Sequence, residues 1–223
     1  MTKQAEQLGF WGVKGSGKTS KMIELMSNTN RQIYLDSMGN THIKGATRLK
    51  TLRGVLTHIK KNWHKGYKIV IDVPNGNRKQ ACMDFMHEFI KVMFRVQKPY
   101  YNSKKGIAGF EIDLVIDEAH KFFPLHGLKD EYYLFCEDLF TLGRHYGLNI
   151  LGGSQRLAQV NTAFRGNCTQ QFFFAQGDHN DIEAVRKSTG LKADDIRDIK
   201  QFEFLHKSRA FGAEIKKGKT VKY

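Results

Sequence analysis

Eight residues, Gly12 to Thr19, constrain the fold of this chain more than any other segment. They read Gly-Val-Lys-Gly-Ser-Gly-Lys-Thr and satisfy the pattern Gly-x-x-x-x-Gly-Lys-Ser/Thr in full. A short apolar run, Leu8 to Val13, leads into them, and a helix is predicted from Lys18 to Met26. Three glycines permit backbone angles that a side chain would forbid, so consecutive N–H groups can turn inward around a phosphate. The segment therefore predicts a strand, a phosphate cradle and a helix, in that order.

This cradle predicts a nucleotide site of the P-loop class. Lys18 would reach the β- and γ-phosphates as a point charge, and the Thr19 hydroxyl would complete the shell of a magnesium ion. The alternative is an unrelated glycine-rich turn, which the preceding strand and the following helix disfavour. The expected phosphate-binding set is Gly12, Val13, Lys14, Gly15, Ser16, Gly17, Lys18, Thr19 and Ser20.

A second predicted strand ends in two acids. Ile112 to Ile116 is apolar except for one position, and Asp117 and Glu118 follow it directly. We expect Asp117 to hold the magnesium, and Glu118 to orient and deprotonate an attacking water. The alternative, that both acids cap a helix beginning at Ala119, is disfavoured by the apolar run before them. A general base here favours hydrolysis, and no Asn-Lys-x-Asp element for reading guanine occurs, so ATP with Mg²⁺ is the expected cofactor pair.

Predicted strands and helices alternate along the chain, which indicates an α/β fold with a mainly parallel central sheet and helices on both faces. In such a sheet, ligands bind at the carboxyl ends of the strands. We expect one P-loop ATPase domain over residues 1–223, of the additional-strand, catalytic-glutamate (RecA-like) type, with residues 202–223 as a closing hairpin or a basic arm. The other expected strands are Ile33–Leu35, Lys68–Val73, Asn149–Leu151 and Phe172–Phe174. The other expected helices carry apolar stripes at Leu52–Trp63, Phe85–Val96, Phe135–Leu142 and Asp178–Gly190. Pro99 lies just past the end of the second of these helices.

The chain carries a large excess of positive charge. Lys and Arg total 36 against 22 Asp and Glu among 223 residues, a formal net charge of +14. Such a surface attracts polyanions, so nucleic acid is the first candidate partner and an anionic membrane the second, with a merely solvated basic face as the alternative. No run reaches the roughly 18 apolar residues of a spanning helix, and the polar start does not resemble a signal peptide. We therefore expect a cytoplasmic protein.

The cysteines and histidines do not predict a further metal centre. Cys82, Cys136 and Cys168 lie far apart and form no Cys-x-x-Cys pair, and the nine histidines form no His-x-x-x-His pair. Magnesium bound with the nucleotide is the one expected metal.

Three further segments carry a resemblance to a known family: Gly143-Arg144-His145-Tyr146-Gly147-Leu148, then Ser154-Gln155-Arg156, then Asn167-Cys168-Thr169. In this order they resemble the FtsK-HerA family of DNA-pumping P-loop ATPases. The resemblance implies that Gln155 is the polar sensor at the end of a core strand, reading the γ-phosphate. It also implies that Arg144 is an arginine finger for the neighbouring subunit of a ring, with Arg156 as the second candidate.

We expect none of the additional domains of larger relatives, and the chain is similar to the minimal genome-packaging ATPases of membrane-containing viruses. The filamentous-phage Zot-type branch usually adds a transmembrane segment, which places it second. The resemblance implies a homo-oligomer, expected to be a hexamer, that translocates double-stranded DNA. It also implies docking to viral capsid or membrane vertex proteins, in the host cytoplasm or with the virion. The alternatives are a nucleotide-gated assembly or scaffold ATPase, a cellular HerA-like DNA-processing translocase and a small-molecule kinase.

Three loops are candidate DNA contacts. The first is Pro99 to Phe110, where Lys104 and Lys105 would bind phosphates and Tyr100 or Tyr101 would pack on sugars or bases. The second is Asn75 to Lys79 and the third is Lys121 to Lys129. For each, the alternative is a solvated surface loop.

Overall fold

The computed structural model describes residues 5–26, 29–101, 103, 109–127, 129–208 and 215–222. Its strands are β1 (Gln7–Trp11), β2 (Arg31–Asp36), β3 (Thr47–Leu49), β4 (Tyr67–Asp72), β5 (Ile112–Ile116), β6 (Leu148–Ser154), β7 (Gln170–Phe173), β8 (Glu203–Ser208) and β9 (Lys216–Lys219). Its helices are α1 (Lys18–Met26), α2 (Leu52–Asn62), α3 (Lys79–Tyr101), α4 (Ala119–Phe122), α5 (Asp130–Leu142), α6 (Thr162–Asn167), α7 (His179–Thr189) and α8 (Ala193–Arg197). Two 3₁₀ turns, η1 (Gly143–Tyr146) and η2 (Leu157–Gln159), flank β6.

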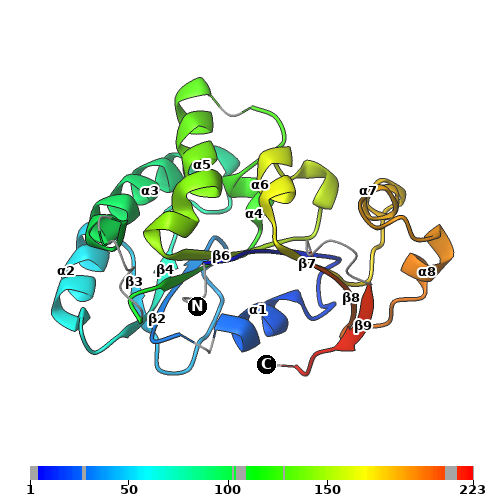
Figure 1. The fold of residues 1–223 in the computed structure, drawn as a ribbon, viewed down its shortest axis with the longest axis horizontal. Coiled ribbons are helices and arrows are strands. Elements are labelled where there is room, and N and C mark those ends of the chain that lie inside the picture. Colours follow the sequence, from blue (N-terminus) through cyan, green and yellow to red (C-terminus); the bar gives the residue numbers. More distant parts are fainter. Residues whose placement is uncertain are drawn as a thin grey trace.

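These strands form one sheet in the order β3-β4-β2-β5-β6-β1-β7-β8-β9 (Figure 1). Strands β1 to β7 pair in parallel, whereas β8 and β9 run antiparallel. The predicted α/β fold with a mainly parallel sheet is confirmed. So is the additional-strand type, because β6 separates β1, which leads into the cradle, from β5, which leads into the acid pair.

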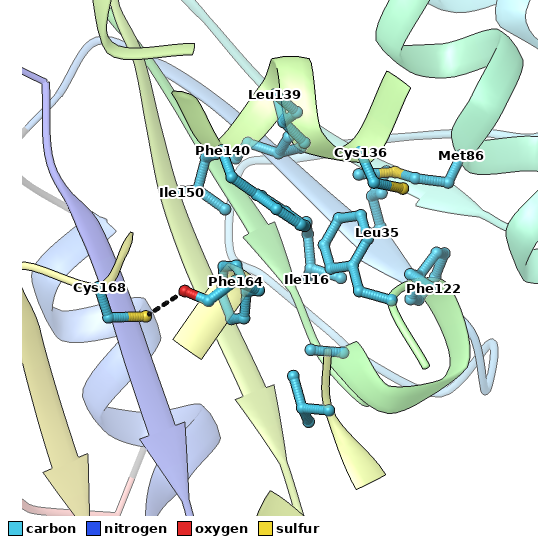
Figure 2. Packing of buried hydrophobic residues seen from close by; sticks show 14 of the residues in the cluster. Leu35, Met86, Ile116, Phe122, Cys136, Leu139, Phe140, Ile150, Phe164 and Cys168 are labelled. Atoms are coloured by element: carbon cyan, nitrogen blue, oxygen red, sulfur yellow. Dashed lines mark hydrogen bonds between the residues drawn. The ribbon is translucent and has the colours of Figure 1, made fainter. Parts of the chain in front are cut away.

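Helices cover the two faces of the sheet unequally. Helices α2 to α6 lie on one face and α1 lies on the other (Figure 1). Successive strand residues point to opposite faces, so Trp11 belongs to the core beneath the larger layer while its neighbour Phe10 packs with α1. Figure 2 shows part of the larger core, where side chains from strands, α3, α5 and α6 meet: Leu35, Met86, Ile116, Cys136, Leu139, Phe140, Ile150 and Phe164.

Helix α7 begins and ends where the sequence predicts. The Asp178 side chain accepts a hydrogen bond from the backbone N–H of Asn180 at 2.9 Å, which caps the first turn. Gly190 ends the helix with φ +77°, a left-handed conformation that glycine adopts at little cost.

Helix α3 extends further than expected, since Pro99 lies inside it and not past its end. A proline lacks its N–H, and its ring clashes with the carbonyl four residues earlier, which kinks a helix. Only Tyr100 and Tyr101 follow Pro99 in α3, so a kink here displaces little of the helix. Aromatic packing supports this end, because the rings of Tyr101 and Tyr146 stack with centroids 4.6 Å apart.

The parallel strands give the sheet two functionally different edges. We call the edge at which β1, β2, β4, β5 and β6 end the carboxyl edge, and the opposite one the amino edge. Both predicted motifs follow strand ends, so both lie at the carboxyl edge.

Candidate nucleotide site

The cradle leaves β1 and closes over the N-terminus of α1. Gly12 N–H donates to Ser154 O at 3.1 Å and Val13 N–H donates to Ala175 O at 2.9 Å, so the neighbouring segments hold the start of the loop. Gly17 has φ +111°, and a Cβ there would lie 2.9 Å from the Phe202 ring. Glycine is therefore required at this position both for its backbone angle and for space.

Two buried groups of the cradle fit an anionic ligand. Within the described part of the chain, the buried Ser16 hydroxyl has no hydrogen-bond partner, which a phosphate oxygen would supply. The Lys18 ammonium is also buried and donates to Val13 O at 2.9 Å. Burial lowers the pKa of Lys18, while the nearby carboxylates of Asp117 and Glu118 oppose that shift.

The structure brings the two predicted magnesium ligands together, although 98 positions separate them in the chain. The Thr19 hydroxyl donates to Asp117 Oδ2 at 3.1 Å. Tyr34 on β2 donates to the same oxygen at 3.0 Å. Burial and the neighbouring Glu118 raise the pKa of Asp117, and burial together with Asp117 raises that of Tyr34. A hydroxyl beside a carboxylate at a helix N-terminus is a donor set that suits Mg²⁺.

Glu118 occupies an uncommon backbone conformation with φ +57° and ψ +47°. It takes the N-cap position of α4, but its side chain caps nothing, contrary to the capping alternative. Gln155 Nε2 donates to Glu118 Oε1, and His120 Nδ1 lies 3.3 Å from Glu118 Oε2. The carboxylate is thus directed along the carboxyl edge toward the end of β6, as a water-activating base beside the cradle would need.

His120 and Tyr34 are contacts that the sequence did not predict. His120 Nδ1 also lies 3.1 Å from the Ser154 hydroxyl. Burial lowers the pKa of His120, and the Glu118 carboxylate opposes this effect. Neither residue belongs to a motif, and only the order of strands in the sheet places them here.

Neither arginine reaches the cradle of its own chain. Arg144 is exposed in η1, before β6 begins, and the β1–β6 register places that end of β6 at the amino edge. Arg156 pairs with Asp178 at 3.0 Å and Asp181 at 3.4 Å, which raise its pKa. Any contribution of Arg144 to catalysis therefore requires a second subunit.

A hollow of about 600 Å³ opens beside the cradle and includes residues from the C-terminal segment. Phe202, which has φ +64°, donates its N–H to Ser16 O at 2.9 Å. Gln201 Nε2 donates to Gly15 O at 3.0 Å. The volume falls in the range of small-molecule sites. Its lining comprises Gly15, Gly17, Lys18, Thr19, Ser20, Ile23, Gln201, Phe202 and Lys222.

The three candidate DNA loops fall in different places. Lys104 and Lys105 of the first loop lie outside the described residues. Its Tyr100 packs against Gly147 at the start of β6, hence at the amino edge, away from the cradle. The second and third loops both follow strands at the carboxyl edge and contact each other.

A comparison with family models decides which family this is. The model described as "Zonular occludens toxin (Zot)" matches residues 10–178, which span the cradle, the acid pair and Gln155. The chain belongs to the Zot family. Zot proteins are P-loop ATPases related to FtsK-HerA, so the resemblance seen in the sequence is confirmed at that level, and the chain is an ATPase. The matching model represents the branch that the sequence placed second, and so far as the described residues go, no helix is long and apolar enough to cross a membrane.

Solved structures share the fold of this Zot-family chain at low identity. B204, the DNA-packaging ATPase of Sulfolobus turreted icosahedral virus, is 16% identical with a TM-score of 0.71, over 100% of both chains. The genome packaging NTPase B204 of Sulfolobus turreted icosahedral virus 2, in complex with ATP-gammaS, is 16% identical with a TM-score of 0.70, over 98% of both chains. VirB4 of Thermoanaerobacter pseudethanolicus is 14% identical with a TM-score of 0.67, over 97% of this chain and 90% of that one. A search of curated proteins gave no match.

Proposed function

We propose that this chain is an ATP-driven translocase of double-stranded DNA that works as a homo-oligomeric ring, with viral genome packaging as its role. One observation supports the hydrolytic part above all. The pair Thr19–Asp117 and the pair Glu118–Gln155 lie side by side at one end of the cradle. A metal-binding pair next to a held carboxylate is the arrangement that phosphoryl transfer to water requires.

Each residue of the site then has a chemical role. The N–H groups of the cradle and Lys18 would bind the triphosphate, and Thr19 and Asp117 would hold Mg²⁺, which offsets charge on the phosphate oxygens. Glu118 would accept a proton from the attacking water. Gln155 fixes the Glu118 carboxylate and would respond to the γ-phosphate through that contact. The hollow beside Phe202 would receive the base.

The DNA-moving part rests on charge and on the relatives. A net charge of +14 favours a polyanionic partner. Both B204 proteins are described as packaging proteins, and the structure of one is a complex with ATP-gammaS. Arg144 at the amino edge suits a ring, since a finger must serve a cradle other than its own. A hexamer in the host cytoplasm, docked to a capsid or membrane vertex protein, would fit this role.

The test is the rate of ATP hydrolysis with and without linear double-stranded DNA, at low and high salt. We expect stimulation by DNA that fades as salt rises, because phosphate contacts weaken when counterions compete. Hydrolysis that is indifferent to DNA at every salt concentration would favour a nucleotide-gated assembly ATPase instead. Stimulation without movement along the duplex, measured by displacement of a third strand from a triplex, would contradict translocation and leave a DNA-dependent ATPase of another role.

A further inference from the structure

Two loops that are far apart in the sequence join at the carboxyl edge. One follows β4 and leads into α3, and the other follows α4 and leads into α5. Lys79 Nζ, at the start of α3, donates to His126 O at 3.1 Å, and Lys121 Nζ, within α4, donates to Gly76 O at 3.2 Å, so a lysine next to each loop binds the other loop. Gly76 also lies against the loop after β2, since a Cβ there would come within 2.4 Å of Ser37 O.

These loops gather basic side chains, and among the described residues none of them forms an ion pair with a carboxylate. We call the set Arg78, Lys79, Lys121, His126 and Lys129 the basic edge. Arg78, Lys79, His126 and Lys129 are exposed and Lys121 is half-buried. Both ammonium groups, those of Lys79 and Lys121, bind carbonyl oxygens, and no ion pair joins either to a carboxylate within the described ranges.

Exposed cations elsewhere are often paired within their own helix. Lys91 pairs with Glu88 at 3.0 Å, and Arg197 pairs with Asp194 at 2.9 Å. The basic edge differs because its charge remains available to an external anion. Helix α3 begins at Lys79 and has no acidic residue in its first turn, so the positive end of its long dipole adds to the field. The second loop leads into α5, where Asp130 and Glu131 in the first turn offset the dipole of that helix.

The basic edge is connected to the catalytic carboxylate by a single helical turn. Lys121 N–H donates to Glu118 O at 2.8 Å. His120, between them, contacts both the Glu118 carboxylate and Ser154. A hollow of about 310 Å³ lies at this junction, and its lining includes Lys79, His120 and His126.

We propose that the basic edge binds the phosphate backbone of double-stranded DNA, and that a phosphate drawn to Lys79 and Lys121 moves α4 and thereby the Glu118 carboxylate. This inference rests on the proposed function and names the surface through which DNA would act on hydrolysis. Residues 75–79 read Asn-Gly-Asn-Arg-Lys and offer no apolar side chain for insertion into a bilayer. In the second loop, Phe122 and Phe123 are buried and Leu125 is half-buried, so the described exposed side chains of the basic edge are basic and favour DNA over a membrane. Contacts to phosphates alone suit a motor that must accept any base sequence.

The test compares the intact protein with Lys79→Gln/Lys121→Gln, using a short fluorescent DNA duplex and anisotropy at several salt concentrations. We expect the variant to bind about tenfold or more weakly at low salt, with the slope of log K against log salt reduced by about two. Lys60→Gln/Lys61→Gln is the matched control, because it removes the same charge from exposed residues at the end of α2, next to the start of β4 at the amino edge. The control should keep both the affinity and the slope of the unchanged protein.

ATP hydrolysis is then measured as a function of duplex concentration. The Lys79→Gln/Lys121→Gln variant should need about tenfold or more DNA for half of the full stimulation. If the unchanged protein is stimulated and this variant responds as the control does, the proposal that the basic edge binds DNA is wrong, whereas the proposed translocase function stands. If the unchanged protein neither binds duplex nor is stimulated, the proposed function fails and this surface fails with it.

A vesicle-binding experiment distinguishes DNA from a lipid surface as the partner of the basic edge. Vesicles of phosphatidylcholine with and without phosphatidylserine are co-sedimented with the same proteins. Loss of phosphatidylserine-dependent binding in Lys79→Gln/Lys121→Gln, with duplex affinity unchanged, would reassign the basic edge to an anionic membrane. Unchanged vesicle binding together with weakened duplex binding supports the proposal.

Discussion

Glu118 gives the sharpest test of the hydrolytic site. Its left-handed backbone costs about 1–3 kcal/mol for a residue other than glycine, and the protein keeps it although the side chain caps no helix. Glu118→Gln preserves size but cannot accept a proton from water. We expect turnover to fall by about 10²–10⁴-fold, while ATP binding measured by isothermal calorimetry changes little. Turnover close to that of the unchanged protein would exclude Glu118 as the base.

Lys18 tests the cradle independently of the base. Lys18→Ala removes a buried ammonium that the loop holds next to the expected phosphates. Affinity for ATP should fall by about tenfold to a hundredfold, the value of one or two charge-assisted hydrogen bonds. Lys60→Ala, which removes an exposed charge from α2, is the control. Equal affinities of the Lys18 and Lys60 variants would contradict the assignment.

The sequence was sufficient to predict that some residues of the candidate site lie together, where that depends on local order along the chain. Thr19 and Asp117 were predicted as partners because each ends a motif after a strand, and parallel strands end at one edge. Tyr34 and His120 could not be predicted, because their contacts depend on β2 and β6 being the two neighbours of β5. Strand order is decided by long-range packing, which a local pattern does not encode.

Helices and strands, too, divide into those that a local sequence pattern predicts and those that depend on long-range packing. Periodicity and flanking glycines placed α1 and α7 well, since an amphipathic helix with its caps is a local feature. The short α6 and α8 were missed because five or six residues show no apolar period. A helix beginning at Ala119 was considered only as the disfavoured alternative, and α4 does begin there. Contact of the segment around Phe202 with the cradle could not be predicted either, since it requires the antiparallel β8 to pair with β7 far from the first motif.

Helix α7 should show a dependence of stability on pH. Hydrogen bonds from the Asn180 N–H and from Arg156 lower the pKa of Asp178. A lowered pKa means that this stabilisation is complete above the unfolded value and is lost as the pH falls through the folded value. Asp178→Ala should therefore have a lower melting temperature than the unchanged protein at pH 7. This difference in melting temperature should become smaller as the pH falls.

Asp178→Asn separates the cap from the charge. Asparagine caps helices nearly as well as aspartate but carries no charge to titrate. At pH 7 the melting temperature of Asp178→Asn should lie between those of the unchanged protein and Asp178→Ala. If the difference in melting temperature between the unchanged protein and Asp178→Ala is the same in acid as at pH 7, ionisation of Asp178 does not stabilise α7.

The arrangement of the whole molecule places Arg144 and the cradle at opposite edges of the sheet, so one subunit cannot complete its own site with this side chain. In a ring of head-to-tail contacts, the amino edge of one subunit can face the carboxyl edge of the next.

Arg144→Ala rings should lose about 10³–10⁵-fold in turnover, as expected for loss of an arginine finger. Glu118→Gln rings should also be inactive. When the two proteins are mixed and allowed to exchange subunits, some Arg144→Ala subunits regain an intact finger from a Glu118→Gln neighbour and keep their own base, so ATP hydrolysis should return. The recovery should follow the product of the two mole fractions and should be absent when Glu118→Gln is mixed with itself. If native mass spectrometry shows mixed rings and hydrolysis does not return, Arg144 does not act between subunits, and Arg156 becomes the candidate, whose pairing with Asp178 would have to open for it to reach the phosphates.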